Sequence, residues 1–137
     1  MARDFTSKTL RLLTIFENIA NVSVRDCFTD NDIIYYVVEE GDAKRAIGKN
    51  GVLIKNAEKI IGKKIKIFEY SPDVETFVKN MIPQCKEINI IKNDEQIIEI
   101  KVSKNDRGFV IGRNGQNIKI YKEILKRIYN INDLQVK

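Results

Sequence analysis

The sequence predicts an α+β fold arranged in layers, made of two tandem modules that each pack a three-stranded sheet against helices. Three observations predict it. The pattern I-G-[K/R]-N-G-x-x-I-K occurs at 47–55 and again at 111–119, 64 positions later. Segments with helical and strand periodicity follow one another in the same order around each copy. The length of 137 residues accommodates two small modules, which we assign to residues 1–70 and 71–137.

The first module opens with a predicted amphipathic helix over 4–20. Its apolar face recurs at helical spacing and comprises Leu12, Ile15, Phe16 and Ile19. A strand over 22–28 and a second strand over 33–38 follow, because apolar and β-branched side chains flank the turn-forming residues 29–32.

A short helix over 43–47, with Asp42 as its predicted N-cap, leads into the first glycine turn. A second helix follows that turn and ends at Gly62, which suits a helix C-terminus. The predicted inward face of this helix comprises Leu53, Ile54, Ala57, Ile60 and Ile61. Ile65 and Ile67 alternate with lysines and predict the last strand of the module.

The second module repeats this order. Ser71 as N-cap and Pro72 as the first helical residue predict a helix that stops at Pro83. The apolar stripe of this helix is Val74, Phe77, Val78 and Met81. The two predicted strands on either side of an Asn-Asp turn contain Ile88 and Ile90, then Ile98, Ile100 and Val102. The longer helix after Gly115 presents Ile118, Tyr121, Leu125 and Ile128, and the closing strand contains Leu134 and Val136.

The charge of the chain favours an anionic partner. The formal net charge is +5, and both halves are mildly basic, so binding would depend on where the charges lie rather than on a basic tail. No stretch resembles a signal peptide or a run long enough to span a bilayer, so we expect a cytoplasmic protein with no membrane partner.

The residue types present exclude most catalytic and metal-binding plans. The chain has no His, and Cys27 and Cys85 lack metal spacing, so we expect no zinc site and no cofactor. The paired carboxylates at 39–40 and 94–95 lie beside predicted turns and are interpreted as solvated loop charges. We therefore expect a binding protein rather than an enzyme.

Each glycine turn combines features that suit a phosphodiester backbone. Glycine at both ends lets the backbone approach a ligand closely, and the helix that follows offers free N–H groups and the positive end of its dipole. Lys49 and Arg113 add charge, their asparagine neighbours add an amide donor, and Lys55 and Lys119 would flank the phosphate path. The isoleucine before each turn is expected to pack beneath it. The candidate binding residues are Ile47, Gly48, Lys49, Asn50, Gly51, Lys55, Ile111, Gly112, Arg113, Asn114, Gly115 and Lys119.

Other interpretations of the turns are weaker. A glycine-rich connection between two helices with solvated basic residues explains one copy well but two matching copies poorly. A phosphate-binding P-loop needs a hydroxyl residue after Gly48-Lys49 and a glycine at position 43, and neither is present. A helix-turn-helix DNA reader remains open, although it requires neither glycine at both ends nor strands on both sides.

The order strand, helix, I-G-x-x-G, helix, strand resembles the KH domain, which holds about four single-stranded nucleotides against its Gly-x-x-Gly loop. The helix and strand placed before the core motif resemble the type II arrangement. Two such domains in tandem resemble the KH pair of NusA, and the pair alone resembles the short archaeal NusA-like proteins. The resemblance covers nearly the whole chain and is strongest at 42–61 and 106–125. The second copy, 110–120, matches the family pattern more closely and is expected to be the better-formed site.

The resemblance implies a single-stranded RNA-binding factor that acts in transcription elongation, termination or antitermination. The expected partners are single-stranded RNA and, beyond it, an RNA polymerase elongation complex or ribosomal particles. The alternative function is a ribosomal or ribosome-assembly KH protein that binds rRNA. The connection at 68–72 is short and lacks flexible residues, so we expect the two turns to act as one track for a single RNA strand.

Overall fold

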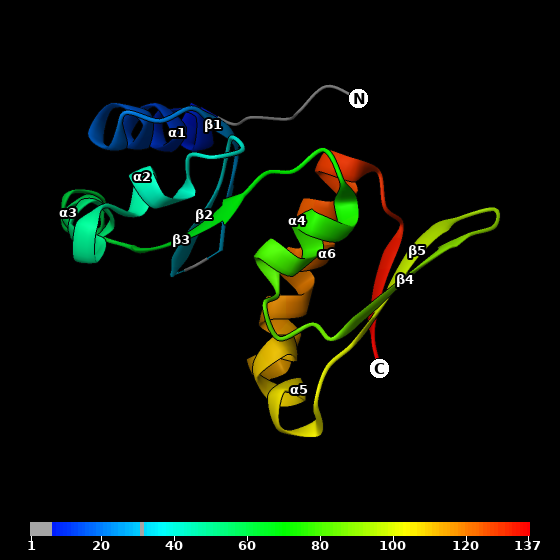
Figure 1. Ribbon diagram of the computed structural model, residues 1–137. Helices are drawn as coiled ribbons and strands as arrows, with labels where there is room; N and C mark the ends of the chain where they lie inside the picture. The colour runs from blue at the N-terminus through cyan, green and yellow to red at the C-terminus, as the bar shows by residue number, and fades with distance from the viewer. Residues whose placement is uncertain (1–6, 31) are drawn as a thin grey trace. The chain divides into compact units, whose positions relative to one another are not determined.

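The structure is a computed structural model that describes residues 7–30 and 32–137. Contacts divide the chain into two compact units, Met1–Pro72 and Asp73–Lys137. Each unit contains one three-stranded sheet and helices (Figure 1), which confirms the predicted α+β class. Residues 4–6 of the first predicted helix and Asn31 of the first predicted turn lie outside the described residues.

The first unit follows the predicted element order. Its elements are α1 (Ser7–Ala20), β1 (Val24–Thr29), β2 (Ile33–Val38), α2 (Ala43–Ile47), the 3-10 turn η1 (Lys49–Gly51), α3 (Val52–Ile61) and β3 (Lys64–Glu69). The sheet order is β1-β2-β3, with β1 antiparallel and β3 parallel to the central strand. Parallel neighbours need a crossover connection, and α2, η1 and α3 form it. The glycine turn therefore lies in the middle of the crossover.

The second unit repeats this topology. Its elements are α4 (Val74–Met81), β4 (Glu87–Lys92), β5 (Gln96–Lys101), α5 (Lys104–Ile111), the 3-10 turn η2 (Arg113–Gly115), α6 (Gln116–Tyr129) and β6 (Asp133–Val136). The sheet order is β4-β5-β6, again antiparallel and then parallel. The crossover from β5 to β6 contains α5, η2 and α6, and so places the second glycine turn as the first one is placed.

Each unit has an apolar core between its sheet and its helices. In the first unit the rings of Phe16 and Tyr36 stack with centroids 4.3 Å apart, and the Tyr36 hydroxyl donates to the Leu12 carbonyl at 2.7 Å. Burial raises the pKa of that hydroxyl well above its ordinary range. In the second unit Phe77 of α4 contacts Tyr129 of α6, with ring centroids 5.0 Å apart. These contacts pack α1 against the sheet in the first unit and α4 against α6 in the second.

The predicted apolar faces differ from the observed ones at two isoleucines. Ile15 of α1 is 40% exposed and Ile60 of α3 is 60% exposed, although both were expected to face inward. The core uses Leu13, Phe16 and Ala20 of α1, and Ala57 of α3. The helix rotation that buries these side chains turns the two isoleucines towards solvent.

One predicted helix cap was wrong, and a second lies at the predicted position without a capping hydrogen bond from its side chain. Helix α4 is capped by Asp73 rather than by Ser71, because the Asp73 carboxylate accepts from the Thr76 backbone N–H at 3.2 Å and the Thr76 hydroxyl at 2.6 Å. These hydrogen bonds lower the pKa of Asp73. Asp42 stands at the N-terminus of α2 but its side chain does not cap the helix. Instead, it pairs with Arg45 at 2.8 Å.

Candidate nucleic-acid interface

The first glycine of each turn has a backbone conformation that only glycine adopts readily. Gly48 has φ 80° and ψ 168°, and Gly112 has φ 79° and ψ 169°. A Cβ added to Gly48 would lie 2.9 Å from both the backbone nitrogen and Cγ of Leu53. A Cβ on Gly112 would lie 2.8 Å from Cγ of Asn117. Glycine therefore lets the turn close against the helix that follows it.

The last two residues of each turn are left-handed in both units. Asn50 has φ 57° and ψ 25°, and Asn114 has φ 56° and ψ 26°. The second glycines, Gly51 and Gly115, have φ 74° and 72° with ψ 18° in both. Asparagine is the non-glycine residue that best tolerates this region, so the backbone supplies a reason for the amide residue that is independent of any ligand. The sequence interpretation of these asparagines as donors did not foresee this role.

Both turns leave a helix N-terminus open. The N–H of Gly51 donates to the Gly48 carbonyl at 3.1 Å, and the N–H of Gly115 donates to the Gly112 carbonyl at 3.1 Å. The second glycine is the N-cap of α3 and of α6, and no side chain caps either helix. The N–H groups of Val52 and Gln116 donate to the Lys49 and Arg113 carbonyls, so the remaining first-turn N–H groups of each helix are the ones open to an anionic ligand beside the turn.

The basic residues of the candidate site lie on the surface beside these N-termini. Lys49 and Arg113 are exposed within the turns, and Lys55 and Lys119 are exposed one helical turn along. In the described parts of the chain none of the four forms a salt bridge. Each unit therefore combines one uncapped helix N-terminus with two unpaired cations.

The isoleucines before the turns do not pack as expected. Ile47 is 38% exposed, and Ile111 is partly buried. The side chains buried beneath the turns are those of the preceding residues, Ala46 and Val110. The helix places residue 46 or 110 on its inner face, so the neighbouring isoleucine lies at the edge of the site, where it can contact a ligand.

The second unit supports its turn with additional contacts. Ser103 caps α5, because its hydroxyl oxygen accepts from the Asp106 N–H at 3.2 Å. The Asn117 side chain of α6 donates to the Phe109 carbonyl at 2.9 Å and so ties the end of α5 to the start of α6. Leu53 occupies the equivalent place in the first unit and cannot form this bond.

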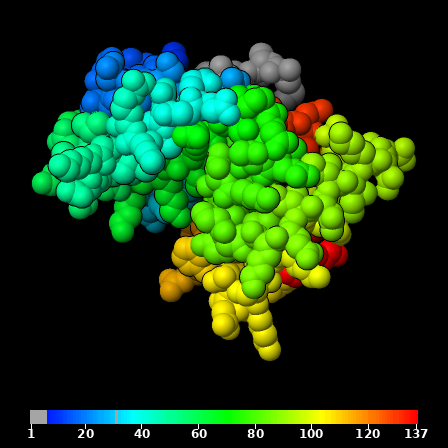
Figure 2. Space-filling view, viewed as in Figure 1, coloured from blue at the N-terminus to red at the C-terminus, as the bar shows by residue number. Residues whose placement is uncertain are grey.

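Sequence reasoning missed one residue beside the second turn. Phe109 is 65% exposed, three residues before Gly112, whereas the aromatic residues were mostly expected in the core. Figure 2 shows side chains of the α5 region, coloured yellow, projecting from the surface. Phe109 precedes the buried Val110 on α5, so the two side chains leave the helix in different directions. An exposed ring at this place can stack on a nucleotide base.

Other candidate chemistry has weaker support. The described residues contain no group of three His, Cys, Asp or Glu side chains arranged to hold a metal ion. Glu39 pairs with Arg25 at 3.3 Å, and Glu40, Asp94 and Glu95 are exposed. Cys27 is buried and Cys85 partly buried, and within the described residues neither forms a disulfide. Over the described range, every helix is too short or too polar to cross a bilayer.

Comparison with known proteins identifies similar chains. The KH domain family matches residues 13–83. The "Probable transcription termination protein NusA" of Methanocaldococcus jannaschii is 34% identical over 96% of this chain and 73% of its own length. The protein of the same name from Thermoplasma acidophilum is 34% identical over 96% of this chain and 93% of its own. The crystal structure of APE1850 superposes with a TM-score of 0.82 at 35% identity, over 97% of this chain and all of that one.

Proposed function

Because this chain belongs to the KH-domain family and, within it, to the archaeal NusA-like proteins, we propose that it is a single-stranded RNA-binding factor of transcription elongation, termination or antitermination. The observation that carries this proposal is the agreement of the two turns. Their corresponding backbone angles differ by at most 2°. Both open an uncapped helix beside a basic residue, a geometry that suits a phosphodiester backbone.

In this mechanism the backbone of each turn binds phosphate and the charges around it orient the strand. The N–H groups at the start of α3 and α6 donate to phosphate oxygens, because those donors have no partner within the helix. Lys49 and Arg113 neutralise the phosphate, and Lys55 and Lys119 hold the next one along. Ile47 and Ile111 line the edge of the path and contact sugars or bases. Asn50 and Asn114 keep the turn left-handed and add one donor each.

We assign one KH domain to residues 1–70 and one to 71–137, each with room for about four nucleotides. Two linked grips on one strand raise the affinity by about 10²–10⁴ over a single grip. The binding proposed here requires no bond to be made or broken, so we expect no catalysis. An RNA polymerase elongation complex in the cytoplasm is the proposed larger setting. A ribosomal role has less support, because the two relatives above are named as transcription termination proteins.

The test is charge reversal in the turns. Lys49→Asp with Asn50→Asp, and separately Arg113→Asp with Asn114→Asp, should each weaken binding of a labelled single-stranded RNA in fluorescence anisotropy by at least about 100-fold, as expected when one of two linked grips is lost. With about four phosphate contacts, the slope of log K against log[salt] for the unaltered protein should be about −3.

The control is Lys86→Asp with Lys92→Asp, which changes two exposed residues of the second unit that lie outside both turns. Circular dichroism must show that all variants are folded. The proposal is wrong if both turn variants bind RNA as tightly as this control does. Cosedimentation of the protein with ribosomal subunits rather than with polymerase would favour the ribosomal alternative.

A further inference from the structure

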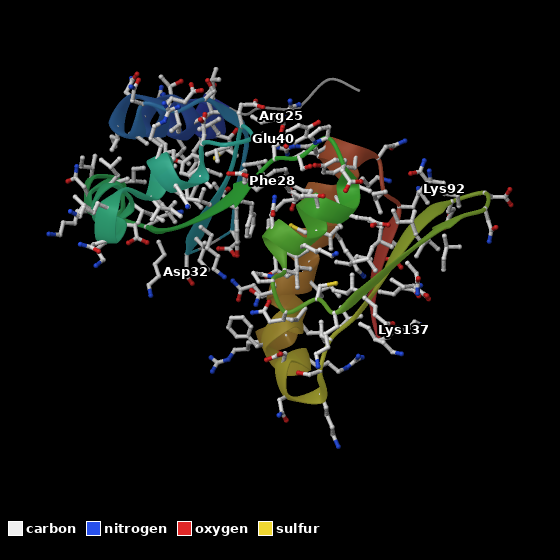
Figure 3. The ribbon with its side chains drawn as sticks, viewed as in Figure 1. Arg25, Phe28, Asp32, Glu40, Lys92 and Lys137 are labelled. Carbon is white, nitrogen blue, oxygen red and sulfur yellow. The ribbon has the colours of Figure 1, made fainter. Side chains whose placement is uncertain are left out.

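A row of lysines continues from the first glycine turn along α3. Lys55 and Lys59 lie four residues apart and so share one face of the helix, and Lys63 and Lys64 follow its end. Figure 3 shows side chains tipped with nitrogen projecting from α3 into solvent. We call Lys55, Lys59, Lys63 and Lys64 the α3 lysine row.

The surface along this row is hollowed. One open hollow of about 320 Å³ is lined by Val52, Leu53, Lys55, Asn56 and Lys59. A second, of about 560 Å³, is lined by Lys55, Glu58, Lys59, Gly62, Lys63 and Lys64. The two hollows share Lys55 and Lys59, so they form one shallow path that begins beside the glycine turn. Val52 is 60% exposed at the start of the path and offers an apolar surface there.

The positive charge of the row is not balanced within the described residues. None of its four lysines forms a salt bridge there. The one acidic residue along the path, Glu58, accepts from the Ile65 N–H at 2.9 Å and is directed towards the start of β3. Like charges at this helical spacing repel each other, so the row does not help the helix fold.

The second unit keeps only part of this row, although it shares the turn. The positions 64 residues after Lys55 and Lys63 are the basic residues Lys119 and Arg127, whereas those after Lys59 and Lys64 are Glu123 and Ile128. On α6, Lys122 pairs with Asp133 at 3.2 Å. The run of four lysines is therefore interrupted at two positions in the second unit.

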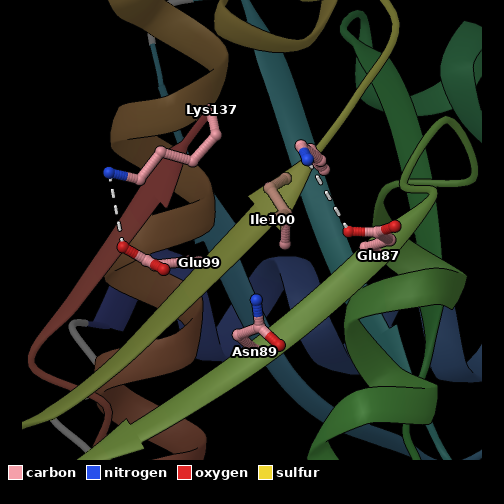
Figure 4. Close-up of a pocket in the computed structure, with 6 residues that line it drawn as sticks. Glu87, Asn89, Glu99, Ile100 and Lys137 are labelled. Atoms are coloured by element: carbon pink, nitrogen blue, oxygen red, sulfur yellow. Dashed lines mark ion pairs between the residues drawn. The ribbon is translucent and has the colours of Figure 1, made fainter.

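A hollow on the sheet of the second unit provides a comparison, because its positive and negative charges are paired. It has a volume of about 300 Å³ and lies on the sheet, lined in part by Glu87, Glu99, Lys101 and Lys137. Its charges are paired, since Lys137 lies 3.3 Å from Glu99 and Lys101 lies 4.0 Å from Glu87 (Figure 4). The charges of that surface are paired, whereas those of the α3 lysine row are not paired within the described residues.

We infer that the α3 lysine row is a phosphate track that extends the RNA path of the first unit beyond its glycine turn. This inference rests on the proposed function. From Lys55 to the end of α3 the helix is about 9 Å long, and Lys63 and Lys64 extend the row further. That length accommodates about two more phosphates of a single strand. The second unit has basic residues at only two of the four row positions, so we expect the two units to contribute unequally to length-dependent binding.

The test compares RNA lengths. Labelled oligouridylates of four and eight nucleotides are titrated against the full chain, the variant Lys59→Gln with Lys63→Gln, and the control Lys86→Gln with Lys92→Gln. All four residues lie outside the turns, and the two variants lose the same charge. We expect Lys59→Gln with Lys63→Gln, the track variant, to bind the 8-mer about 25-fold more weakly than the control does at 0.1 M salt and to bind the 4-mer like the control. Two lost phosphate contacts also reduce the salt slope by about 1.4.

Lys59→Arg with Lys63→Arg keeps the charge and should restore 8-mer binding. If the track variant and the control bind the 8-mer equally, the inference is overturned. The turn variant, which carries Lys49→Asp and Asn50→Asp, is measured in the same titrations and separates the track from the proposed function. If the turn variant weakens binding of both RNAs while the track variant does not, the proposed function stands and the track alone is wrong. If the unaltered protein binds neither RNA, both are wrong.

Discussion

The two glycines of each turn should differ sharply in what they tolerate. Alanine at Gly112 must adopt a backbone region reserved for glycine, which costs about 1–3 kcal/mol. It must also push away the backbone nitrogen of Asn117, 2.9 Å from the new Cβ. Alanine at Gly115 needs only the left-handed conformation, at about 1–2 kcal/mol, and its Cβ would find its nearest atom at 3.7 Å.

Both changes also stiffen the unfolded chain, which stabilises by about 0.4–1 kcal/mol. The net loss of folding free energy is thus about 2–3 kcal/mol for Gly112→Ala and about 1 kcal/mol or less for Gly115→Ala. For a chain of this size the difference corresponds to about 8 °C in Tm. Thermal unfolding followed by circular dichroism measures it. Gly48→Ala and Gly51→Ala in the first unit are matched repeats.

The reasoning is refuted if Gly112→Ala and Gly115→Ala have the same Tm, because the close approach to α6 would then have no energetic consequence. The pair of first-unit variants must show the same order. An order reversed in one unit would mean that the two turns differ in spite of their matching angles.

Three further predictions concern single side chains. Asn114→Gly should keep Tm within about 2 °C, because glycine adopts the same left-handed backbone. If the amide donates to phosphate, this change should weaken RNA binding about tenfold, which fluorescence anisotropy measures. Phe109→Ala should weaken binding of the RNA by about 1–3 kcal/mol through lost stacking, whereas Phe109→Tyr should not; equal affinities of the alanine and tyrosine variants would exclude stacking. Folding lowers the pKa of Asp73, so its cap contributes stability above the pKa that Asp73 has in the unfolded chain. This contribution is lost as the pH falls through the folded-state pKa. The free energy of unfolding should therefore fall less steeply with decreasing pH in Asp73→Asn than in the unaltered protein.

Much of the fold could be predicted from sequence because the chain repeats itself. The agreement of two copies separates helices and strands that one copy would leave ambiguous, and Gly62, at φ 83°, ends α3 as predicted. The exposure of Ile60 could not be predicted, because its repeat partner Ile124 is fully buried. Helix rotation depends on packing against the sheet, and a stripe of apolar residues does not fix it within one residue.

The candidate site was predicted in outline and not in detail. The pattern located both turns, but the left-handed backbone of Asn50 and Asn114 supplies a second reason for those residues that the pattern does not contain. Phe109 was missed because a phenylalanine between valine and glycine is usually a core residue, and only three-dimensional packing shows it exposed. The predicted cap of α4 lay two residues before the observed cap, Asp73, because Ser71 and Pro72 also match a helix start.

The most direct test of RNA binding by the two turns is a map of backbone amide shifts in ¹H–¹⁵N correlation spectra as a short single-stranded RNA is added. The amides of 49–53 and 113–117 should shift most, because they form the turns and the helix N-termini that would lie against phosphate. If those amides stay in place while the largest shifts lie in α1 or β4, the turns do not hold RNA.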